Sequence, residues 1–420
     1  MKYVHKNNLT LFILILSAGT AYKVPYLKAV FYDELINSLQ ISNSELGMLT
    51  SVYAIIKMII YIPCGILADR LNLRKVLSGS LYMLGILTAV YALMPDLFIL
   101  RILHGLYAVA NVFFWPSFIK GIRILGEERN QGKVFGFSEG FRGIAGSITT
   151  LISLRILDTF ITAQRPLTFV LIFYTFVYIS LGATLGCLFP DKKNIQTNMK
   201  AQSLQSYITV FKMPAIWIIS LFIFTTYSMQ IAFEYTTSYL TQIIGISMFG
   251  AGIIATFRDN ICGIIGSPAA GVIADRMHSP SRIASILAGM EVLLSLLLLI
   301  ITANISFLVP ITIIVLVFAT IHYGVRGTYY SSMAELNVPV ELTATGTAVV
   351  AVLGYTPDIF MHLWCGNLLD SYGKEDGFRK ILLVIALFAI LSFIVILGLR
   401  SYHKKKRQSE TPLFEKGLIS

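Results

Sequence analysis

Charged residues are scarce in this chain: Asp, Glu, Lys and Arg make up 13% of its 420 residues, whereas hydrophobic residues make up 56%. Soluble domains carry about 25% charged residues, so the composition excludes a soluble globular protein. Alternation of polar and apolar residues is missing from runs such as Leu296 to Ile301, although membrane β-strands require it. The sequence therefore predicts an all-α membrane protein surrounded by the lipid bilayer.

Cysteines are also few, and their spacing does not fit a metal site. The four of them lie in apolar stretches, at Cys64, Cys187, Cys262 and Cys365. Such cysteines usually pack as small apolar residues, so we predict no metal site and no cofactor. The polar segments lack a set of Ser, His and Asp and a phosphate-binding glycine loop, so we do not expect an enzyme.

Apolar stretches that are long enough to cross a membrane follow one another along the chain. A helix of about 20 apolar residues crosses about 30 Å of hydrocarbon. We predict twelve spans, at residues 9–31, 47–68, 76–94, 97–119, 134–156, 167–189, 215–240, 248–274, 283–303, 305–328, 344–368 and 380–400. The spans are continuous rather than alternating, as helices require.

Basic residues outnumber acidic ones by 33 to 22, for a formal net charge of +11. They gather in alternate connections between the spans, for example after the second span and in the run from Lys404 to Arg407. This pattern does not form the single basic face of a nucleic-acid-binding protein. The positive-inside rule places both termini in the cytoplasm. Exceptions on the opposite side are Arg155, Arg165, Lys374, Arg379 and Lys380.

One short motif occurs twice, once in each half of the chain. Gly65 is followed after three residues by Asp69-Arg70, and Gly271 is followed in the same way by Asp275-Arg276. The longest polar interval lies between the sixth and seventh spans. We therefore predict two pseudo-symmetric six-helix bundles, at 1–189 and 213–400, with a cytoplasmic linker at 190–212 and a cytoplasmic tail at 401–420.

The repeated motif resembles the loop signature of the major facilitator superfamily, in which Gly, three residues, Asp and Arg are followed by Gly and basic residues. Asn72 stands where the family has this second Gly, and Arg101 and Gly105 match the family's fourth-helix signature. The resemblance implies a multi-pass transporter of the inner cell membrane. It also implies a conformational gate, formed by Gly65, Asp69, Arg70, Arg74, Asp275 and Arg276.

A narrower similarity is to the sugar-phosphate permease and organophosphate antiporter branch of that superfamily. It rests on Phe114-Trp115-Pro116, on Glu128-Arg129 and on the stretch from Gly132 to Gly146. Arg142 falls where that branch has a histidine close to the substrate. The branch implies a phosphorylated or acidic cargo. Because Arg142 replaces the histidine, the resemblance does not identify the cargo.

Charges inside the spans are costly in a bilayer, so each should face a cavity or a partner. Lys57 lies twelve residues before Asp69, with Tyr53 and Tyr61 one turn away on the same face. Cations and tyrosines together suit a bound anion. The predicted substrate contacts are Lys23, Lys57, Tyr53, Tyr61, Trp115, Arg142, Arg258 and Arg326.

Several of these cations have an alternative role as a structural partner. Lys57 could pair with Asp358 or Glu234 across the bundle, and Arg142 could neutralise Glu139 three residues before it. Adjacent helical residues point about 100° apart. Of Arg258 and its neighbour Asp259, only one should therefore face a cavity squarely, and we favour Arg258.

Proton coupling is the second chemistry that the intramembrane charges suggest, because histidine titrates near neutrality. The candidates for coupling are Arg101, Glu139, Glu234 and Asp358. Arg101 shares one helical stripe with His104, and Asp358 shares another with His362; a structural hydrogen-bond network would give the same pattern. Glu291 lies on the ninth span, which in this superfamily is outside the cavity, and it is interpreted as a packing residue or as a residue of the cytoplasmic half.

The charges and the resemblance together predict a secondary transporter that moves a small organic anion, such as a sugar phosphate or acidic sugar derivative. It would work by alternating access and as a monomer. One alternative is a proton-coupled exporter of drugs or neutral solutes, although the fifth span lacks the Gly-Pro motif of drug antiporters. The other is a membrane sensor built on a transporter-like fold.

Overall fold

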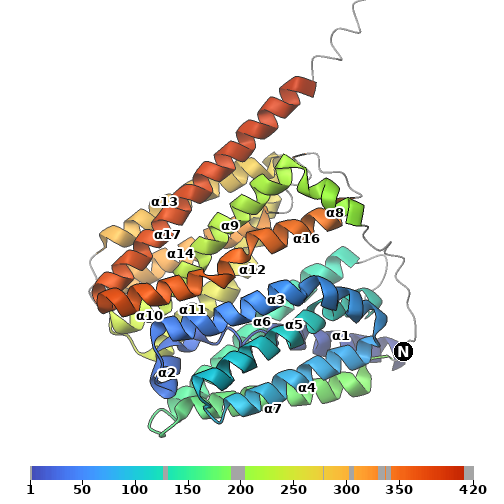
Figure 1. Cartoon of the computed structure of the whole chain (residues 1–420), viewed down its shortest axis with the longest axis vertical. Coiled ribbons are helices and arrows are strands. Elements are labelled where there is room, and N and C mark those ends of the chain that lie inside the picture. The colour runs from blue at the N-terminus through green and yellow to red at the C-terminus, as the bar shows by residue number, and fades with distance from the viewer. Residues whose placement is uncertain are drawn as a thin grey trace, which may run out of the picture. The chain divides into compact units, whose positions relative to one another are not determined.

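The computed structural model describes residues 2–125, 131–190, 204–277, 279–301, 307–329, 336 and 342–410, and within these ranges it contains helices and no strand (Figure 1). Nine segments of the described residues are long and apolar enough to cross a membrane, and Asn8–Thr20 is a shorter apolar helix. The last of the nine, Thr345–Lys404, contains a helix break at Gly373. It therefore holds two of the predicted spans.

Seven helices form the first half of the chain. They are α1 (Lys2–Thr20), α2 (Lys28–Leu39), α3 (Asn43–Arg70), α4 (Leu73–Tyr91), α5 (Leu97–Leu125), α6 (Gln131–Thr159) and α7 (Pro166–Leu188). The first predicted span is not one continuous helix, because residues 21–27 form turns between α1 and α2. These turns carry Lys23 and place it beside α6 rather than within a helix.

The second half is divided more finely. Its elements are α8 (Leu204–Phe211), α9 (Pro214–Glu234), α10 (Thr236–Gln242), α11 (Met248–Thr256), the π-helix η2 (Phe257–Ile261), α12 (Cys262–Met277), α13 (Pro280–Ile300), α14 (Leu308–Gly327), α16 (Thr343–Gly354), the 3-10 helix η5 (Thr356–Ile359) and α17 (Met361–Glu410). Helix α8 lies within the predicted linker, and α17 continues ten residues beyond the predicted end of the last span at Arg400.

Polar caps explain where several helices begin. Ser42 and Glu45 form a capping box at the start of α3, in which each side chain accepts a backbone N–H of the other residue. Asn72, which replaces the glycine of the superfamily motif, accepts a hydrogen bond from the backbone N–H of Lys75 at 3.2 Å and so caps α4. The departure from the motif therefore has a local structural role.

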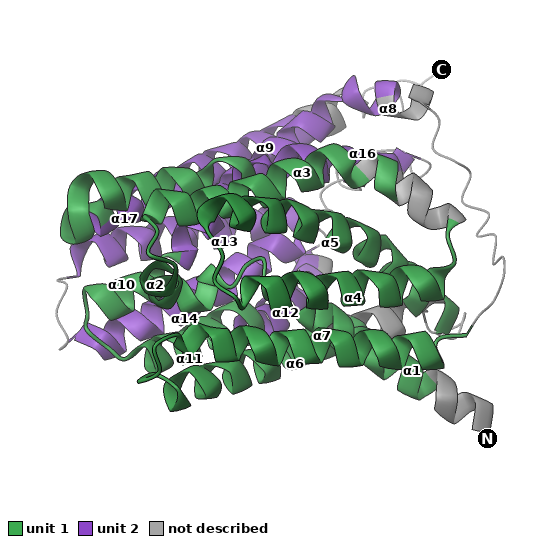
Figure 2. Cartoon of the chain, turned by 60° about the horizontal axis from the view of Figure 1, so that its bottom comes forward, with its two compact units in different colours: residues 1–197, 235–261, 358–377 green, residues 198–234, 262–357, 378–420 purple. Residues whose placement is uncertain are grey.

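Two compact units make up the fold (Figure 2). Unit 1 contains residues 1–197, 235–261 and 358–377, and unit 2 contains 198–234, 262–357 and 378–420. Unit 1 thus combines the first half of the chain with two segments of the second half. The prediction that the two six-helix bundles correspond to residues 1–189 and 213–400 remains a prediction.

The chain leaves regular α-helix at three of the points where it passes from one unit to the other. Tyr235 separates α9 from α10, the π-helix η2 ends at Ile261, and the 3-10 helix η5 covers the passage at residues 357–358. Short π and 3-10 segments often mark bends or functional positions within helices. The three breaks divide these spans into segments that belong to different units.

Close helix contacts within each unit depend on small residues. In unit 1, a Cβ added at Gly19 of α1 would lie 2.6 Å from the carbonyl oxygen of Arg142 on α6. In unit 2, a Cβ at Gly266 of α12 would lie 2.1 Å from the carbonyl oxygen of Thr320 on α14. Glycine at these two positions lets the backbones approach, as is common between membrane helices.

Candidate functional site

Three cations of unit 1 lie among aromatic rings and form what we term the cationic cluster: Lys23, Lys57 and Arg142. The Lys57 ammonium is 5.7 Å from the centroid of the Tyr53 ring, and the Arg142 guanidinium is 5.7 Å from the centroid of the Trp115 ring. Both distances fit cation–π contacts. Four elements supply these residues, namely the turns after α1 and helices α3, α5 and α6.

The aromatic residues of the cluster also contact one another. Tyr22 meets Trp115 edge to face at a centroid distance of 5.9 Å, and Tyr26 meets Tyr53 in the same way at 5.4 Å. Asn111 on α5 donates a hydrogen bond to the Tyr53 hydroxyl at 3.1 Å. These contacts hold the faces of α3 and α5 together and fix the rings against which the cations lie.

The two lysines of the cluster keep their ammonium groups out of ion pairs within the described part of unit 1. Lys57 is half-buried, and its ammonium lies over the Tyr53 ring. Lys23 is also half-buried, and a Cβ added at Gly146 would lie 3.1 Å from its Nζ. Lys57 does not pair with Asp358, because the Asp358 carboxylate meets Tyr26 and His362. That alternative for Lys57 is not formed in this structure.

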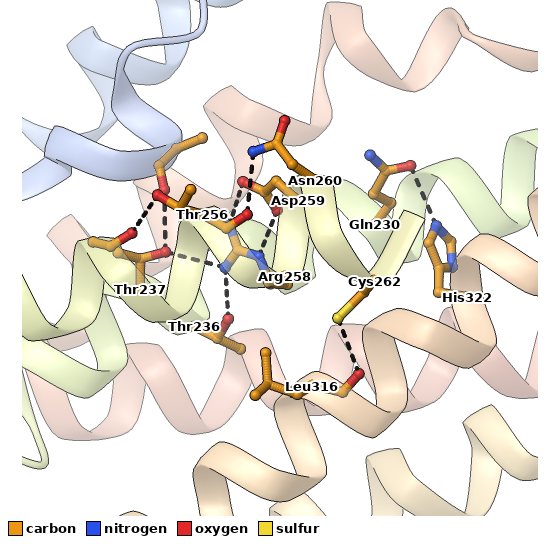
Figure 3. A network of polar contacts seen from close by, with 12 residues as sticks. Gln230, Thr236, Thr237, Thr256, Arg258, Asp259, Asn260, Cys262, Leu316 and His322 are labelled. Carbon is orange, nitrogen blue, oxygen red and sulfur yellow. Dashed lines mark hydrogen bonds and ion pairs between the residues drawn. The ribbon is translucent and has the colours of Figure 1, made fainter. Parts of the chain in front are cut away.

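The guanidinium of Arg258 forms hydrogen bonds with neighbouring side chains of this protein (Figure 3). Its Nε lies 2.7 Å from Asp259 Oδ1, and its Nη2 lies 3.0 Å from Asp259 Oδ2. Its Nη1 donates to the hydroxyls of Thr236 at 2.9 Å and Thr237 at 3.0 Å. Arg258 and Asp259 thus bind each other within η2, and the expectation that only one of them faces a cavity stays a prediction.

A buried chain of polar groups links α2 to the start of α17 within unit 1. Lys28 Nζ contacts His362 Nδ1, and His362 Nε2 lies 3.2 Å from Asp358 Oδ1. The Tyr26 hydroxyl donates to Asp358 Oδ2 at 3.0 Å. Lys28, Asp358 and His362 are 5%, 4% and 0% exposed. Sequence reasoning selected Asp358 but missed Lys28, whose partner lies 334 positions away.

Two further carboxylates join the same segments at one end of unit 1. The Asp33 carboxylate on α2 accepts hydrogen bonds from Ser238, Thr241 and Gln242. The Asp370 carboxylate on α17 accepts the backbone N–H groups of Asn43 and Ser44, at 3.1 and 2.8 Å. Asp370 therefore acts as a cap for α3, because a helix N-terminus favours a negative charge.

A second buried polar cluster lies in unit 2, and it includes the residue that sequence reasoning set aside. Glu291 on α13 is fully buried, and its Oε1 lies 2.9 Å from His322 Nδ1 on α14. His322 Nε2 lies 3.2 Å from Gln230 Oε1, and Arg326 Nη1 donates to that same oxygen at 3.0 Å. The interpretation of Glu291 as a mere packing residue does not account for these contacts.

The other predicted residues are placed as follows. Arg101 is half-buried, and its Nε has no hydrogen-bond partner among the described residues. Tyr61 and Glu234 are half-buried on α3 and α9. Arg74 lies in the first turn of α4, and Arg276 is exposed at the end of α12. The side chains of Gly65, Asp69, Arg70, Glu139 and Asp275 lie outside the described residues.

Comparisons with known proteins identify relatives of this chain. The family model of the Major Facilitator Superfamily matches residues 11–361. The chain is 25% identical to the inner membrane protein YqcE of Escherichia coli K12, over 96% of each chain. It is 25% identical to the inner membrane protein YihN of the same organism, over 91% of this chain and 93% of the relative.

A solved structure has the same fold at low sequence identity. The inward-facing, unoccupied structure of a bacterial homologue of the human lysosomal transporter Spinster aligns with a TM-score of 0.77 and 14% identity. The alignment covers 95% of this chain and 98% of that chain. The helical layout described above is therefore that of a known transporter fold.

The chain belongs to the major facilitator superfamily. It is a multi-pass protein of the inner membrane, as its relatives are named. The predicted fold class, an all-α membrane protein of twelve helices in two six-helix bundles, is confirmed. Members of this superfamily are transporters that bind small molecules within the membrane, which agrees with the predicted class of partner.

Proposed function

We propose that this protein is a secondary transporter of a small organic anion, which it moves by alternating access as a monomer. The observation that supports the anion most directly is the cationic cluster. Lys23 and Lys57 bring two ammonium groups into the interior of unit 1 without an ion pair to a described residue of that unit, although Asp259 attracts Lys23, and Arg142 adds a guanidinium over Trp115. A bilayer-embedded protein retains such charges where a ligand of opposite sign compensates them.

The chemistry of the cluster fits a carboxylate or phosphate attached to a ring. Arg142 offers a planar fork of N–H donors, and the two lysines offer compact positive charges. Tyr53 and Trp115 present ring faces to these cations, and such faces also suit the apolar side of a sugar. We therefore propose a sugar phosphate or acidic sugar derivative as cargo. Arg326 of unit 2 remains a predicted contact, whereas Arg258 is better explained by its pairing with Asp259.

The test begins with purified protein and three probes: glucose 6-phosphate, glucuronate and inorganic phosphate. A probe that binds the folded state should raise the melting temperature, because binding stabilises that state. The same probe should then enter liposomes that contain the protein. Lys57→Ala and Arg142→Ala should each weaken its binding by about tenfold or more, since a hydrogen bond to a charged group contributes about 1.5–3 kcal/mol.

Lys212→Ala is the matched control, because Lys212 is exposed after α8 and lies apart from the cluster in sequence and in unit. It should leave probe binding unchanged. If no anion binds or moves, or if Lys57→Ala and Arg142→Ala keep full uptake, the proposal fails. Efflux of a cationic dye driven by a pH gradient, together with no response to anions, would favour the proton-coupled exporter instead.

A further inference from the structure

Glu291 and His322 meet in the interior of unit 2. Glu291 is 0% exposed and His322 is 2% exposed. The distance between Glu291 Oε1 and His322 Nδ1 is 2.9 Å, which is the length of a hydrogen bond. Which atom carries the hydrogen in this contact depends on what the other ring nitrogen of His322 does.

Gln230 and Arg326 determine the role of that other nitrogen. Arg326 Nη1 can only donate, and it lies 3.0 Å from Gln230 Oε1, so the amide oxygen of Gln230 must face it. The same oxygen lies 3.2 Å from His322 Nε2 (Figure 3). An amide oxygen accepts hydrogen bonds, so His322 Nε2 must carry a hydrogen.

A neutral imidazole with its hydrogen on Nε2 has a lone pair on Nδ1. An ionised Glu291 also presents only lone pairs, and two acceptors 2.9 Å apart repel each other. One additional proton between Nδ1 and Oε1 removes the conflict, whichever atom holds it. Glu291 Oε2 has no hydrogen-bond partner among the described residues, which makes an unshared carboxylate there still more costly.

The charged and titratable groups around the pair are few within the described residues. Arg326 is the nearest cation through Gln230, and its guanidinium lies 5.3 Å from the centroid of the Tyr323 ring. Tyr329 lies near enough for an ionised Glu291 to act on it, and its hydroxyl donates to Thr226 at 2.6 Å. Two other ionisable groups of unit 2 have different partners: the Cys262 thiol on α12 donates to the carbonyl of Leu316, and Arg400 on α17 donates to Ser285.

We propose that Glu291 and His322 together bind one transportable proton, and that Arg326 couples this proton to the binding of the anion. The proton arrives from water on one side of the membrane and becomes shared between Nδ1 and Oε1. It returns to water on the other side when the pair is exposed there. No other bond forms or breaks in this step.

The charges give the direction of the coupling. With the proton bound, the pair is neutral and the charge of Arg326 is available to an anion. Without the proton, the pair carries one negative charge that compensates Arg326. Anion and proton therefore favour each other's binding, as linkage requires, and the two move in the same direction. This part of the inference rests on the proposed function, whereas the proton site itself does not.

A proton count tests the site without any substrate. Purified protein is titrated between about pH 9 and about pH 5, the range in which histidine-containing sites normally exchange protons. Wild type should take up one proton per chain more than Glu291→Gln, whose amide can donate to Nδ1 permanently. Asp158→Asn, which removes a surface carboxylate of unit 1, should match wild type.

Equal proton uptake by wild type and Glu291→Gln would overturn the proton site. If Glu291→Gln does not fold, His322→Gln replaces it, and it should lose the same proton. Glu291→Asp keeps a carboxyl group and should keep the proton. A purely structural role for Glu291 would change the melting temperature but not the number of protons bound.

A transport assay then tests the coupling with whichever of the three probe anions binds. In liposomes whose outside is one pH unit more acidic, Glu291→Gln should accumulate at least about tenfold less probe than wild type. One coupled proton per anion supports about tenfold accumulation per pH unit. Exchange of labelled for unlabelled probe should change by less than about twofold, since it needs no net proton movement. Wild-type accumulation of the probe that does not respond to the pH gradient would overturn the coupling. Absence of all probe movement would contradict the proposed function, while the proton count would still decide the site.

Discussion

His362 in unit 1 and His322 in unit 2 each face a buried carboxylate, yet their remaining neighbours give the two pairs different chemistry. His362 Nδ1 meets the ammonium of Lys28, a donor, and its Nε2 donates to Asp358. A neutral imidazole satisfies both contacts, and Lys28 balances the charge of Asp358. His322 Nε2 donates to Gln230 instead, so that its Nδ1 meets Glu291 without a hydrogen of its own.

The difference shows that the second neighbour of a histidine decides whether a histidine–carboxylate pair must hold an extra proton. Charged Lys28, neutral His362 and ionised Asp358 satisfy each other's hydrogen bonds without an additional proton. We therefore expect these three residues to act as a structural link within unit 1. Glu291 and His322, by contrast, form a hydrogen bond with each other only after the pair binds one proton from water.

Removal of Lys28 should have the largest effect on stability. Lys28→Met leaves Asp358 as a buried charge without its cation, and breaking one side of a buried ion pair costs about 3–5 kcal/mol. The melting temperature in detergent should fall clearly. Glu291→Gln should cost less than about 1 kcal/mol, because the amide keeps the hydrogen bond to His322.

The control for Lys28→Met is the double variant Lys28→Met with Asp358→Asn, in which both charges are gone. It should recover much of the lost melting temperature, since a coupled pair is not additive. Equal, small losses for Lys28→Met and Glu291→Gln would contradict the difference that we draw between the two histidines.

Gln230→Met should have an intermediate effect, seen in the pH dependence of transport. Without the amide oxygen, His322 is free to place its hydrogen on Nδ1 and donate to an ionised Glu291. The extra proton is then no longer required, and it binds less tightly by about one hydrogen bond, or about 1 kcal/mol. Half-maximal uptake of the probe anion should move to a pH lower by about one unit.

Gln230→Glu provides the opposite change, because a carboxylate in place of the amide still accepts from His322 and adds negative charge. It should move half-maximal uptake to higher pH. A pH profile that stays the same in both variants would show that Gln230 does not determine the protonation of the pair.

Asp370→Asn should lower the melting temperature much less than Lys28→Met does. Asp370 is exposed and accepts backbone N–H groups at the start of α3, so its loss resembles the loss of a helix cap, about 1 kcal/mol. The measurement is again the melting temperature, with Asp376→Asn as an exposed control on the same segment. A loss as large as that of Lys28→Met would mean that the cap, rather than the buried chain, holds residues 358–377 in unit 1.

The fold was predictable from the sequence because membrane helices carry their own signal. Apolar length marks each span, and the Gly65 and Gly271 motifs mark the repeat. Breaks inside spans carry a weaker signal: the turns at residues 21–27 hold Lys23 and Pro25 among apolar residues, and η2 has the sequence Phe-Arg-Asp-Asn-Ile between apolar stretches. Hydropathy measures burial in lipid and is insensitive to a change of helix type.

The candidate site was predictable in part, and the limit is pairing over long distances in sequence. Lys57 with Tyr53 was expected from the spacing within one helix, and the ring contact is present. Glu291 could not be matched with His322, 31 positions away, because no helical periodicity links different helices. Lys28 was missed for the same reason, and because it lies just beyond the turns that end α1.

The π-helix η2 has a consequence for the helix that follows it. A π turn holds one residue more than an α turn, and one residue corresponds to a rotation of about 100°. All side chains from Cys262 onward are therefore rotated by about that angle relative to an uninterrupted α-helix. This single insertion sets which face of α12 carries Cys262 to Leu316 and Gly266 to Thr320. The packing of α12 against α14 thus depends on one extra residue in η2.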